Sequence, residues 1–559
     1  MTYMPADGSM AYQPKAATPN EDDDDDVMII GIDFGTTYSG VAWATVADFA
    51  SEQINLITSW PGTGREEGKA PTELFYEDDQ IFWGYEIPDD ADPVRWFKLL
   101  LVKDEDLNED TRSSEFVLRG RKMLKETGKT AIGLIADYLR LLWRHILETV
   151  KKARGEYVVD ALRFHVVITG MEEAARQAGI MDSRPAGETK LSFAPEPEAA
   201  AFSTLCEPGR RTQPGDVYLI CDAGGGTVDL ISYKISSVNP ISMEEAVEVT
   251  GGLCGGIFID EAFERACKSR LGRRWDHLSK AGIKEILRGE WEHAIKPQFN
   301  PQNSKKEYTV SIPAEAFGKN SLDDLSREPF IKKGRIHFSS SHIQEAFTES
   351  FAGIDKLIDG QIKQANSQGL TVKGIILVGG LGASPYLYEH LKDRHSRGGI
   401  TILQSGGMRP RTAICNGAVY KGFLTGATEG ANGQTQIAYG IESPITVKST
   451  ISRTSIGFIY HAPFDPAKHL EADKAWYPNE GEYRANNQIN WYLKRGDNVS
   501  TTHPVRHNFY RLHEKDFGGL FEVELFESEE HVPPSRVDKT LVNHSDILTW
   551  ITATPPSKD

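Results

Sequence analysis

Two short segments of the sequence combine a carboxylate with glycines and threonines in the same order. The first, residues 33–37, reads DFGTT, and the second, residues 222–227, reads DAGGGT. Glycine lets backbone N–H groups point at a phosphate, because it tolerates positive φ and carries no side chain. Threonine hydroxyls add hydrogen-bond donors, and a nearby carboxylate can hold hydrated Mg²⁺. Each segment therefore has the composition of half of a phosphate-binding site.

Both segments lie between apolar runs that are typical of buried strands. VMIIGID (27–33) leads into the first, VYLICD (217–222) leads into the second, and an apolar-rich run follows each. The pattern predicts a strand, a phosphate-sized turn and a returning strand, twice. One copy alone is better explained as a tight turn. Two copies in matching context predict two similar α/β lobes that face one another.

Other elements of the two predicted lobes follow from hydrophobic periodicity. Apolar residues recur with helical spacing from Ile132 to Val150, which predicts an amphipathic helix with one buried face. FHVVIT (164–169) and GIILV (374–378) read as buried strands, and the second leads into GGLGASP and a helix-like segment.

Three competing nucleotide motifs fail. Gly128-Lys129-Thr130 resembles the end of a P-loop, but Met123 stands where the upstream glycine is required. Gly68-Lys69 fails in the same way, with Thr63 at that position. Gly224 to Gly226 cannot be a Rossmann turn, since a strand-like run follows them where a helix is needed. We therefore interpret the first two sites as plain loops.

Composition and charge exclude several classes of function. The chain has 559 residues and a formal net charge of -18, which argues against a general nucleic-acid binder. Its five cysteines form no CxxC pair, so neither a disulfide scaffold nor a zinc site is expected. No signal peptide and no membrane-spanning segment is recognisable, so the expected location is the cytosol, with the nucleus as the alternative. Residues 1–26 end in an acidic run and are predicted to be a disordered leader.

Four motifs carry a resemblance to a known family. GIDFGTTYSG (31–40) and CDAGGGTVDL (221–230) are similar to the two phosphate motifs of the heat-shock protein 70 chaperones. ILVGGLGASPYL (376–387) resembles their adenosine motif, and APEPEAAA (194–201) resembles the segment that connects their lobes. The resemblance covers roughly residues 27–425. Further details, such as EWEHAIKPQF (290–299), look closest to the divergent member-12 group and its fungal relatives.

The resemblance implies a fold of the actin-like ATPase superfamily, with duplicated ribonuclease-H-like lobes around a nucleotide cleft. We expect lobe I at residues 27–210 and lobe II at residues 211–430. Residues 431–559 contain aromatic residues and alternating runs, which predict a β-rich C-terminal region. Its aromatic side chains, Trp476 and Tyr483 among them, either pack in a core, which we favour, or line a peptide groove.

The resemblance also implies catalytic roles. Asp33 and Asp222 would hold Mg²⁺ through its water shell, and Glu196 would lie beside the attacking water. Thr227 would contact the terminal phosphate. Lys98 falls where the family places a lysine near the γ-phosphate, although a surface lysine with a snorkelling stem is an equal alternative. Glu196 also suits the first turn of a helix, where a carboxylate complements the helix dipole.

The same resemblance implies the residues that bind the nucleotide. They are Gly35, Thr36, Thr37, Tyr38, Gly224, Gly225, Gly226, Asp229, Glu292, Lys296, Gly379, Gly380 and Leu381.

Departures from the family pattern leave the function open. After Thr169 the chain lacks a proline and a longer stretch that typical members have, and the acidic-leucine linker is absent between Lys421 and Ser449. We expect a protein that binds ATP and Mg²⁺, hydrolyses ATP slowly and closes its lobes with nucleotide state, with protein or peptide clients and unknown co-chaperones as partners. The alternatives are a nucleotide-dependent interaction protein without turnover and a small-molecule kinase of the same superfamily, for which no motif supplies an acidic base.

Overall fold

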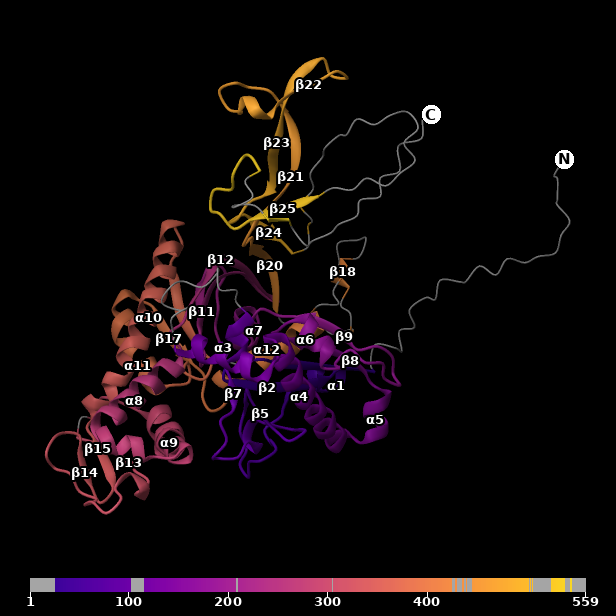
Figure 1. Ribbon diagram of the computed structural model, residues 1–559. Coiled ribbons are helices and arrows are strands. Elements are labelled where there is room, and N and C mark those ends of the chain that lie inside the picture. Colours follow the sequence, from indigo (N-terminus) through magenta and orange to yellow (C-terminus); the bar gives the residue numbers. More distant parts are fainter. Residues whose placement is uncertain are drawn as a thin grey trace.

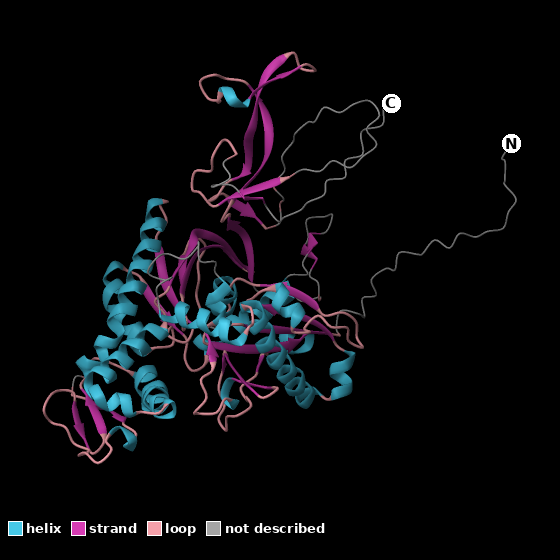
Figure 2. Cartoon of the chain, in the orientation of Figure 1, coloured by secondary structure: helices cyan, strands magenta, loops and turns pink. Residues whose placement is uncertain are grey.

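The computed structural model describes residues 26–101, 115–207, 210–303, 305–424, 428–429, 435–436, 439, 445–501, 503, 505, 524–537 and 543–544. The predicted acidic leader lies outside these residues, apart from Asp26. The described chain is a mixed α/β structure in which helices pack on two central sheets and a third sheet projects from them (Figures 1 and 2). This arrangement confirms the predicted two-lobed, actin-like α/β fold with a β-rich C-terminal extension.

The first central sheet contains the first phosphate-type hairpin. Its strand order is β3-β2-β1-β8-β9, with β4 paired to β2. Strand β1 is buried throughout, because β2 and β8 flank it and helices cover the sheet. The strands of this sheet are β1 (Val27–Asp33), β2 (Tyr38–Thr45), β3 (Asn55–Leu56), β4 (Ala70–Pro71), β8 (Arg163–Ile168) and β9 (Lys190–Phe193).

Helices of the first half support this sheet. The predicted amphipathic helix is α4 (Ala131–Arg154), which begins where Thr130 Oγ1 accepts a hydrogen bond from Gly133 N. Its apolar face joins the core beneath β1 and β8. The shorter helices here are α1 (Val46–Ala50), α3 (Glu115–Thr127), α5 (Glu156–Ala161), α6 (Glu172–Gln177) and α7 (Glu196–Leu205).

The second central sheet contains the second hairpin and runs β17-β16-β10-β11-β12-β20-β24. Strand β10 pairs antiparallel with β11 and parallel with β16, as β1 does with β2 and β8. The strands are β10 (Val217–Ala223), β11 (Val228–Val238), β12 (Ile241–Gly252), β16 (Val372–Val378), β17 (Thr401–Gln404), β20 (Ile445–Ile451) and β24 (Asn498–Ser500). Because β20 and β24 belong to this sheet, it extends past residue 430, where we placed the end of lobe II. The domain boundaries themselves stay predictions.

Helices connect the second sheet to its surroundings. Helix α12 (Arg409–Leu424) follows β17 but packs on α7 and β1 of the first half, so it ties the two halves together. The remaining long helices are α8 (Gly256–Leu271), α10 (Ser340–Ser367) and α11 (Pro385–His395).

Two small sheets flank the cleft. One has the order β6-β5-β7 and stands beside the first central sheet; the other has the order β13-β15-β14 and lies at the end of helices α8 and α9 (Figure 1). Their elements are β5 (Glu73–Glu77), β6 (Gln80–Trp83), β7 (Val94–Arg95), β13 (Tyr308–Ser311), β14 (Phe330–Lys332), β15 (Arg335–Phe338), the helix α9 (Lys280–Ile286) and the π-helix η5 (Leu287–Ile295).

The C-terminal sheet, in the order β22-β23-β21-β25-β26, extends away from the two central sheets (Figure 1). Its buried core is small and is centred on Ile489 and Phe526. The expectation that its aromatic residues pack in a core is wrong for Trp476 and Tyr483, which are both 52% exposed. The strands are β21 (Ser455–Pro463), β22 (Lys474–Tyr477), β23 (Glu482–Leu493), β25 (Leu525–Ser528) and β26 (Asn543–His544).

Candidate nucleotide site

The tips of the two glycine-rich hairpins meet across the centre of the molecule. A Cβ atom added at Gly225 would lie 1.9 Å from Thr37 Oγ1, and one added at Gly226 would lie 3.0 Å from Thr36 Cγ2. Real Cβ atoms do not approach other atoms as closely as 1.9 Å. Only glycine therefore permits this approach of the second hairpin to the first.

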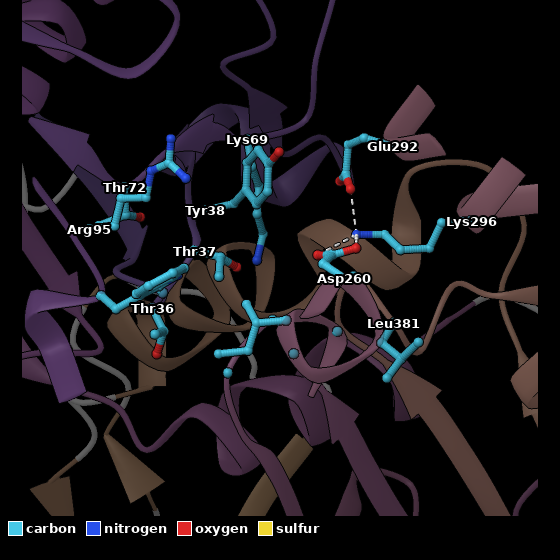
Figure 3. Close-up of a pocket in the computed structure, with 18 of the residues that line it drawn as sticks. Thr36, Thr37, Tyr38, Lys69, Thr72, Arg95, Asp260, Glu292, Lys296 and Leu381 are labelled. Carbon is cyan, nitrogen blue, oxygen red and sulfur yellow. Dashed lines mark hydrogen bonds and ion pairs between the residues drawn. The ribbon is translucent and has the colours of Figure 1, made fainter. Parts of the chain in front are cut away.

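A cavity of about 590 Å³ opens beside these tips. Its volume lies in the range of small-molecule sites, and its lining comes from both halves of the molecule. Every residue predicted for the site lines it, except Lys98 and Asp229. In Figure 3, Thr36, Thr37 and Tyr38 stand on one side, while Glu292 and Lys296 stand on the other.

The carboxylates beneath the hairpins are buried. Asp33 is 1% exposed and Asp222 is 4% exposed. Burial raises the pKa of Asp33, although Lys69 lowers it, and burial raises the pKa of Asp222 well above its ordinary value, with Glu196 adding to the effect. Burial, helped by Glu196, also raises the pKa of Asp229 to about 6. The site thus concentrates negative charge that a bound cation would relieve.

Lys98 reaches this acidic cluster from outside the cavity. It lies in η3 (Phe97–Leu101), ion-pairs with Glu196, and donates a hydrogen bond of 2.7 Å to Phe34 O. The alternative of a snorkelling surface lysine is therefore wrong, because Glu196 and the carbonyl oxygen of Phe34 hold the ammonium. Its partner Glu196 begins α7 beside Pro197, so the helix-terminal interpretation of Glu196 holds alongside its position in the cavity.

Lys69 is the site residue that the sequence interpretation missed. Its Nζ lies 2.5 Å from Asp33 Oδ2, and it lines the cavity. Burial lowers the pKa of Lys69, but the nearby carboxylates of Asp33 and Asp222 raise it by more. The pKa therefore lies above its ordinary value, and the ammonium form is favoured. Gly68 and Lys69 do lie in a loop before β4, as interpreted, but the loop is part of the site because Lys69 pairs with Asp33. The P-loop pattern tests only local spacing, and this contact depends on the pairing of β4 with β2.

The far side of the cavity is organised by an acidic residue that was also missed. Lys296 Nζ lies 2.9 Å from Asp260 Oδ1 and also pairs with Glu292 (Figure 3). Trp291 Nε1 donates to the same Asp260 oxygen at 2.8 Å. Burial raises the pKa of Asp260 to about 6, against the lowering effect of Lys296. The sequence signalled only the pairing of Glu292 with Lys296, through their i, i+4 spacing, and gave no sign that Asp260 joins them.

Gly379 completes the floor of the cavity. Its φ is +87°, and a Cβ there would lie 2.5 Å from Asp222 Oδ1. The turn after β16 thus runs directly against the second hairpin and presents Gly380 and Leu381 to the cavity. The first hairpin is held by a different contact, because Phe34 N donates to Thr169 Oγ1 at 3.1 Å.

Ion pairs join the two walls of the cleft at its rim. Arg288 of η5 pairs with Glu73 of β5, and Lys284 of α9 lies 3.0 Å from Asp89. The cations come from the side that carries Glu292 and Lys296, and the acids come from the side that carries the first hairpin. These contacts favour a closed cleft.

Within the described residues, neither a metal cluster nor a membrane-spanning helix is present. No group of three or more His, Cys, Asp or Glu side chains there could hold a metal ion by itself. Asp222 fits a hydrated Mg²⁺ that takes its other oxygens from water and phosphate, whereas Asp33 already pairs with Lys69. Among the described helices, none is long and apolar enough to span a membrane.

Comparison with known proteins agrees with this architecture. The chain is 24% identical over 471 residues to heat shock 70 kDa protein 12B of Homo sapiens, which covers 67% of this chain and 66% of that protein. It is 23% identical over 454 residues to heat shock 70 kDa protein 12A of Mus musculus, with 65% of each chain covered. The chain thus spans slightly less than two thirds of these relatives. No protein-family model matches it. The resemblance to the member-12 group, read from the motifs, is confirmed.

Proposed function

We propose that this protein binds ATP and ADP together with Mg²⁺ in the central cavity and hydrolyses ATP slowly. The observation that carries the proposal is the close approach of the two glycine-rich hairpins above two buried carboxylates. Such a pair of hairpins can surround a phosphate chain from both sides with backbone N–H groups and threonine hydroxyls. The similarity to two heat shock 70 kDa proteins supports the same proposal.

In this proposal the residues divide the work by position. Thr36, Thr37 and Thr227 donate hydrogen bonds to phosphate oxygens. Asp222 would hold the metal through its water shell, and Asp33 would join it only if Lys69 gave up its ion pair there. Bound Mg²⁺ supplies charge neutralisation of the phosphates. The ion-paired cluster of Asp260, Glu292 and Lys296 lies on the wall of the cavity that would receive the adenosine moiety.

Hydrolysis on this site needs positioning and no covalent intermediate. A water held by Glu196 and Asp222 attacks the γ-phosphorus, the bond to the β–γ bridging oxygen breaks, and ADP and phosphate leave. In this step a carboxylate beside the water, Glu196 or Asp222, accepts its proton. Lys98 offsets the negative charge that develops on the phosphoryl oxygens.

Nucleotide state would be coupled to closure of the cleft. The ion pairs Arg288–Glu73 and Lys284–Asp89 span the two walls, so each depends on how far the walls close. A chaperone role, in which closure controls binding of a protein or peptide client, is the family-level extension of this proposal.

A second candidate is a nucleotide-dependent interaction protein without turnover. The ion pair between Lys69 and Asp33 favours it, because a carboxylate already neutralised by a lysine is less available to a catalytic metal. Binding and turnover therefore need separate measurements.

The test is ATP titration calorimetry together with single-turnover hydrolysis on the purified protein, beside Asp222→Asn and Thr227→Ala. We expect ATP binding by the wild type, and turnover that falls about a hundredfold in each variant. Glu345→Gln, on the exposed face of α10, serves as the control and should change nothing. Binding without any turnover would select the second candidate, and absence of ATP binding would refute both.

A further inference from the structure

Lys69 contacts one of the two carboxylates that the proposed function assigns to the metal. Its Nζ lies 2.5 Å from Oδ2 of the buried Asp33, and the negative charge of Asp222 also favours an ammonium there. These are the two carboxylates that would hold hydrated Mg²⁺. The lysine side chain is only 15% exposed, so water screens this ion pair poorly.

The surrounding sheet fixes the lysine in this position. Strand β4 pairs with β2 through Ser39 and Ala70, which places Lys69 beside the next residue of β2, Gly40. Gly40 lies directly opposite Asp33 in the β1–β2 register. A Cβ at Gly40 would lie 3.0 Å from Lys69 Cγ, so the lysine stem runs over the glycine toward Asp33.

A second contact holds the backbone of this lysine. Tyr85 Oη donates a hydrogen bond of 3.1 Å to Lys69 O, from the far side of the loop. The stem is therefore guided by β2 and the backbone is held by Tyr85, so the ammonium position is built by the fold. A surface lysine that met Asp33 by chance would have neither support.

A divalent ion at Asp33 must compete with this ammonium. Both would draw on the same carboxylate, the metal through its bound waters and the ammonium directly, so placing both there would bring two like charges close together. The ammonium is a compact charge with three donors and already satisfies Asp33 Oδ2. Metal binding to the free protein thus requires the lysine to leave a site in which the sheet holds it.

We propose that Lys69 is a built-in cation that takes the place of the divalent metal at Asp33. This proposal rests on the proposed nucleotide function and specifies its metal requirement. The nucleotide-free protein binds divalent metal weakly, and the lysine supplies positive charge to the phosphate chain, so nucleotide affinity depends little on Mg²⁺. Removing the lysine charge restores an ordinary carboxylate metal site.

The test is a Mn²⁺ titration of the nucleotide-free, full-length protein, followed by electron paramagnetic resonance. Mn²⁺ shares the preference of Mg²⁺ for carboxylate and water oxygens. We expect Lys69→Gln to bind one Mn²⁺ at least about tenfold more tightly than the wild type, and Lys69→Arg to show no gain. Lys151→Gln, which removes a surface lysine of α4 that pairs with Glu156, is the matched control and should behave like the wild type.

Thermal melting of each variant reports whether it folds. Equal Mn²⁺ affinity of wild type and a folded Lys69→Gln variant would overturn the proposal. Tight Mn²⁺ binding by the wild type itself would also overturn it, and this result needs no variant. Loss of the gained Mn²⁺ site in the double variant Asp33→Asn, Lys69→Gln would place the metal at Asp33, as proposed.

Nucleotide affinity gives a second, separable readout. We expect the affinity of the wild type for ADP to change less than about threefold between EDTA and saturating Mg²⁺, and that of Lys69→Gln to fall more than about tenfold in EDTA. A large loss for the wild type in EDTA would overturn the role of Lys69. Absence of ADP binding in every protein would overturn the nucleotide function instead, while the Mn²⁺ titration would still decide which cation Asp33 holds.

Discussion

The two glycine-rich hairpins have the same backbone plan but opposite electrostatics. In the first, Asp33 pairs across the strands with Gly40, and Lys69 fills the space above that glycine. In the second, Asp222 pairs with Asp229, so a second acid stands where the first hairpin has room for a lysine. The same motif thus yields one neutralised carboxylate and one acidic pair.

This difference teaches that the residue opposite the motif aspartate sets its charge state. A glycine admits a cation from a neighbouring strand, whereas an aspartate adds negative charge. A metal ion bound between the hairpins would therefore be drawn toward Asp222 and Asp229, whose pKa values are both raised.

The contact between the hairpin tips is the feature whose loss should matter most. Gly225→Val would drive a branched side chain into Thr37, because even a Cβ there would lie 1.9 Å from Thr37 Oγ1. We expect ATP affinity, measured by calorimetry, to fall by more than about a hundredfold. Gly64→Ala, where an added Cβ meets nothing within 4 Å, is the control. Retained affinity in Gly225→Val would show that the two tips do not form one site.

Lys98 connects the first hairpin to Glu196, the acid proposed to hold the attacking water. Lys98→Met removes the ammonium that contacts both Glu196 and Phe34 O. We expect single-turnover hydrolysis to slow by roughly a hundredfold, with ATP affinity changed far less. Lys151→Met, a surface lysine on α4, should leave the rate unchanged. Parallel losses of rate and affinity would mean that Lys98 serves binding rather than the chemical step.

The acidic pair of the second hairpin predicts a pH-dependent stability. The pKa of Asp229 is raised to about 6 in the folded protein, so its ionisation costs stability above that pH and costs none below its ordinary pKa. Asp229→Asn should therefore raise the free energy of unfolding at pH 8 by roughly 3 kcal/mol, and by less as the pH falls through 6. Denaturant unfolding at pH 8 and pH 5 measures this. A gain that is equal at both pH values would contradict the assignment.

The rim ion pairs should have the smallest effect. Arg288→Gln removes the partner of Glu73 across the cleft, so the walls should separate more readily. We expect release of a fluorescent ADP analogue, followed by stopped flow, to accelerate a few-fold, and more so at low than at high salt. Lys280→Gln, whose pair with Asp92 is more exposed, is the comparison and should change the rate less. An unchanged rate of release in Arg288→Gln would show that the rim ion pairs do not control opening of the cleft.

The sequence predicted the fold well where local patterns decide it. The strands β1, β10 and β16 and the helix α4 begin and end within a few residues of the predicted segments. Apolar runs and helical periodicity carry this information directly. The hairpin turns could be predicted because a phosphate-binding turn needs the small side chain of glycine and the hydroxyl of threonine.

These patterns could not predict residues whose role depends on contacts between elements that lie far apart in the sequence. Lys69 reaches Asp33 only because β4 pairs with β2, and Asp260 meets Lys296 only because α8 packs beside η5. Neither Lys69 nor Asp260 belongs to a sequence motif whose spacing would have predicted its contact. The exposed Trp476 was misjudged for the same reason, since the number of strands packed around it sets its burial.

The central claim is that one nucleotide lies between both hairpins. Hydrogen–deuterium exchange of the full chain, with and without saturating ATP, tests it most directly. We predict slower exchange in the peptides that contain residues 34–38 and 224–227 together, with no change in β21 and β23 of the C-terminal sheet. Protection of only one hairpin, or of neither, would contradict the account.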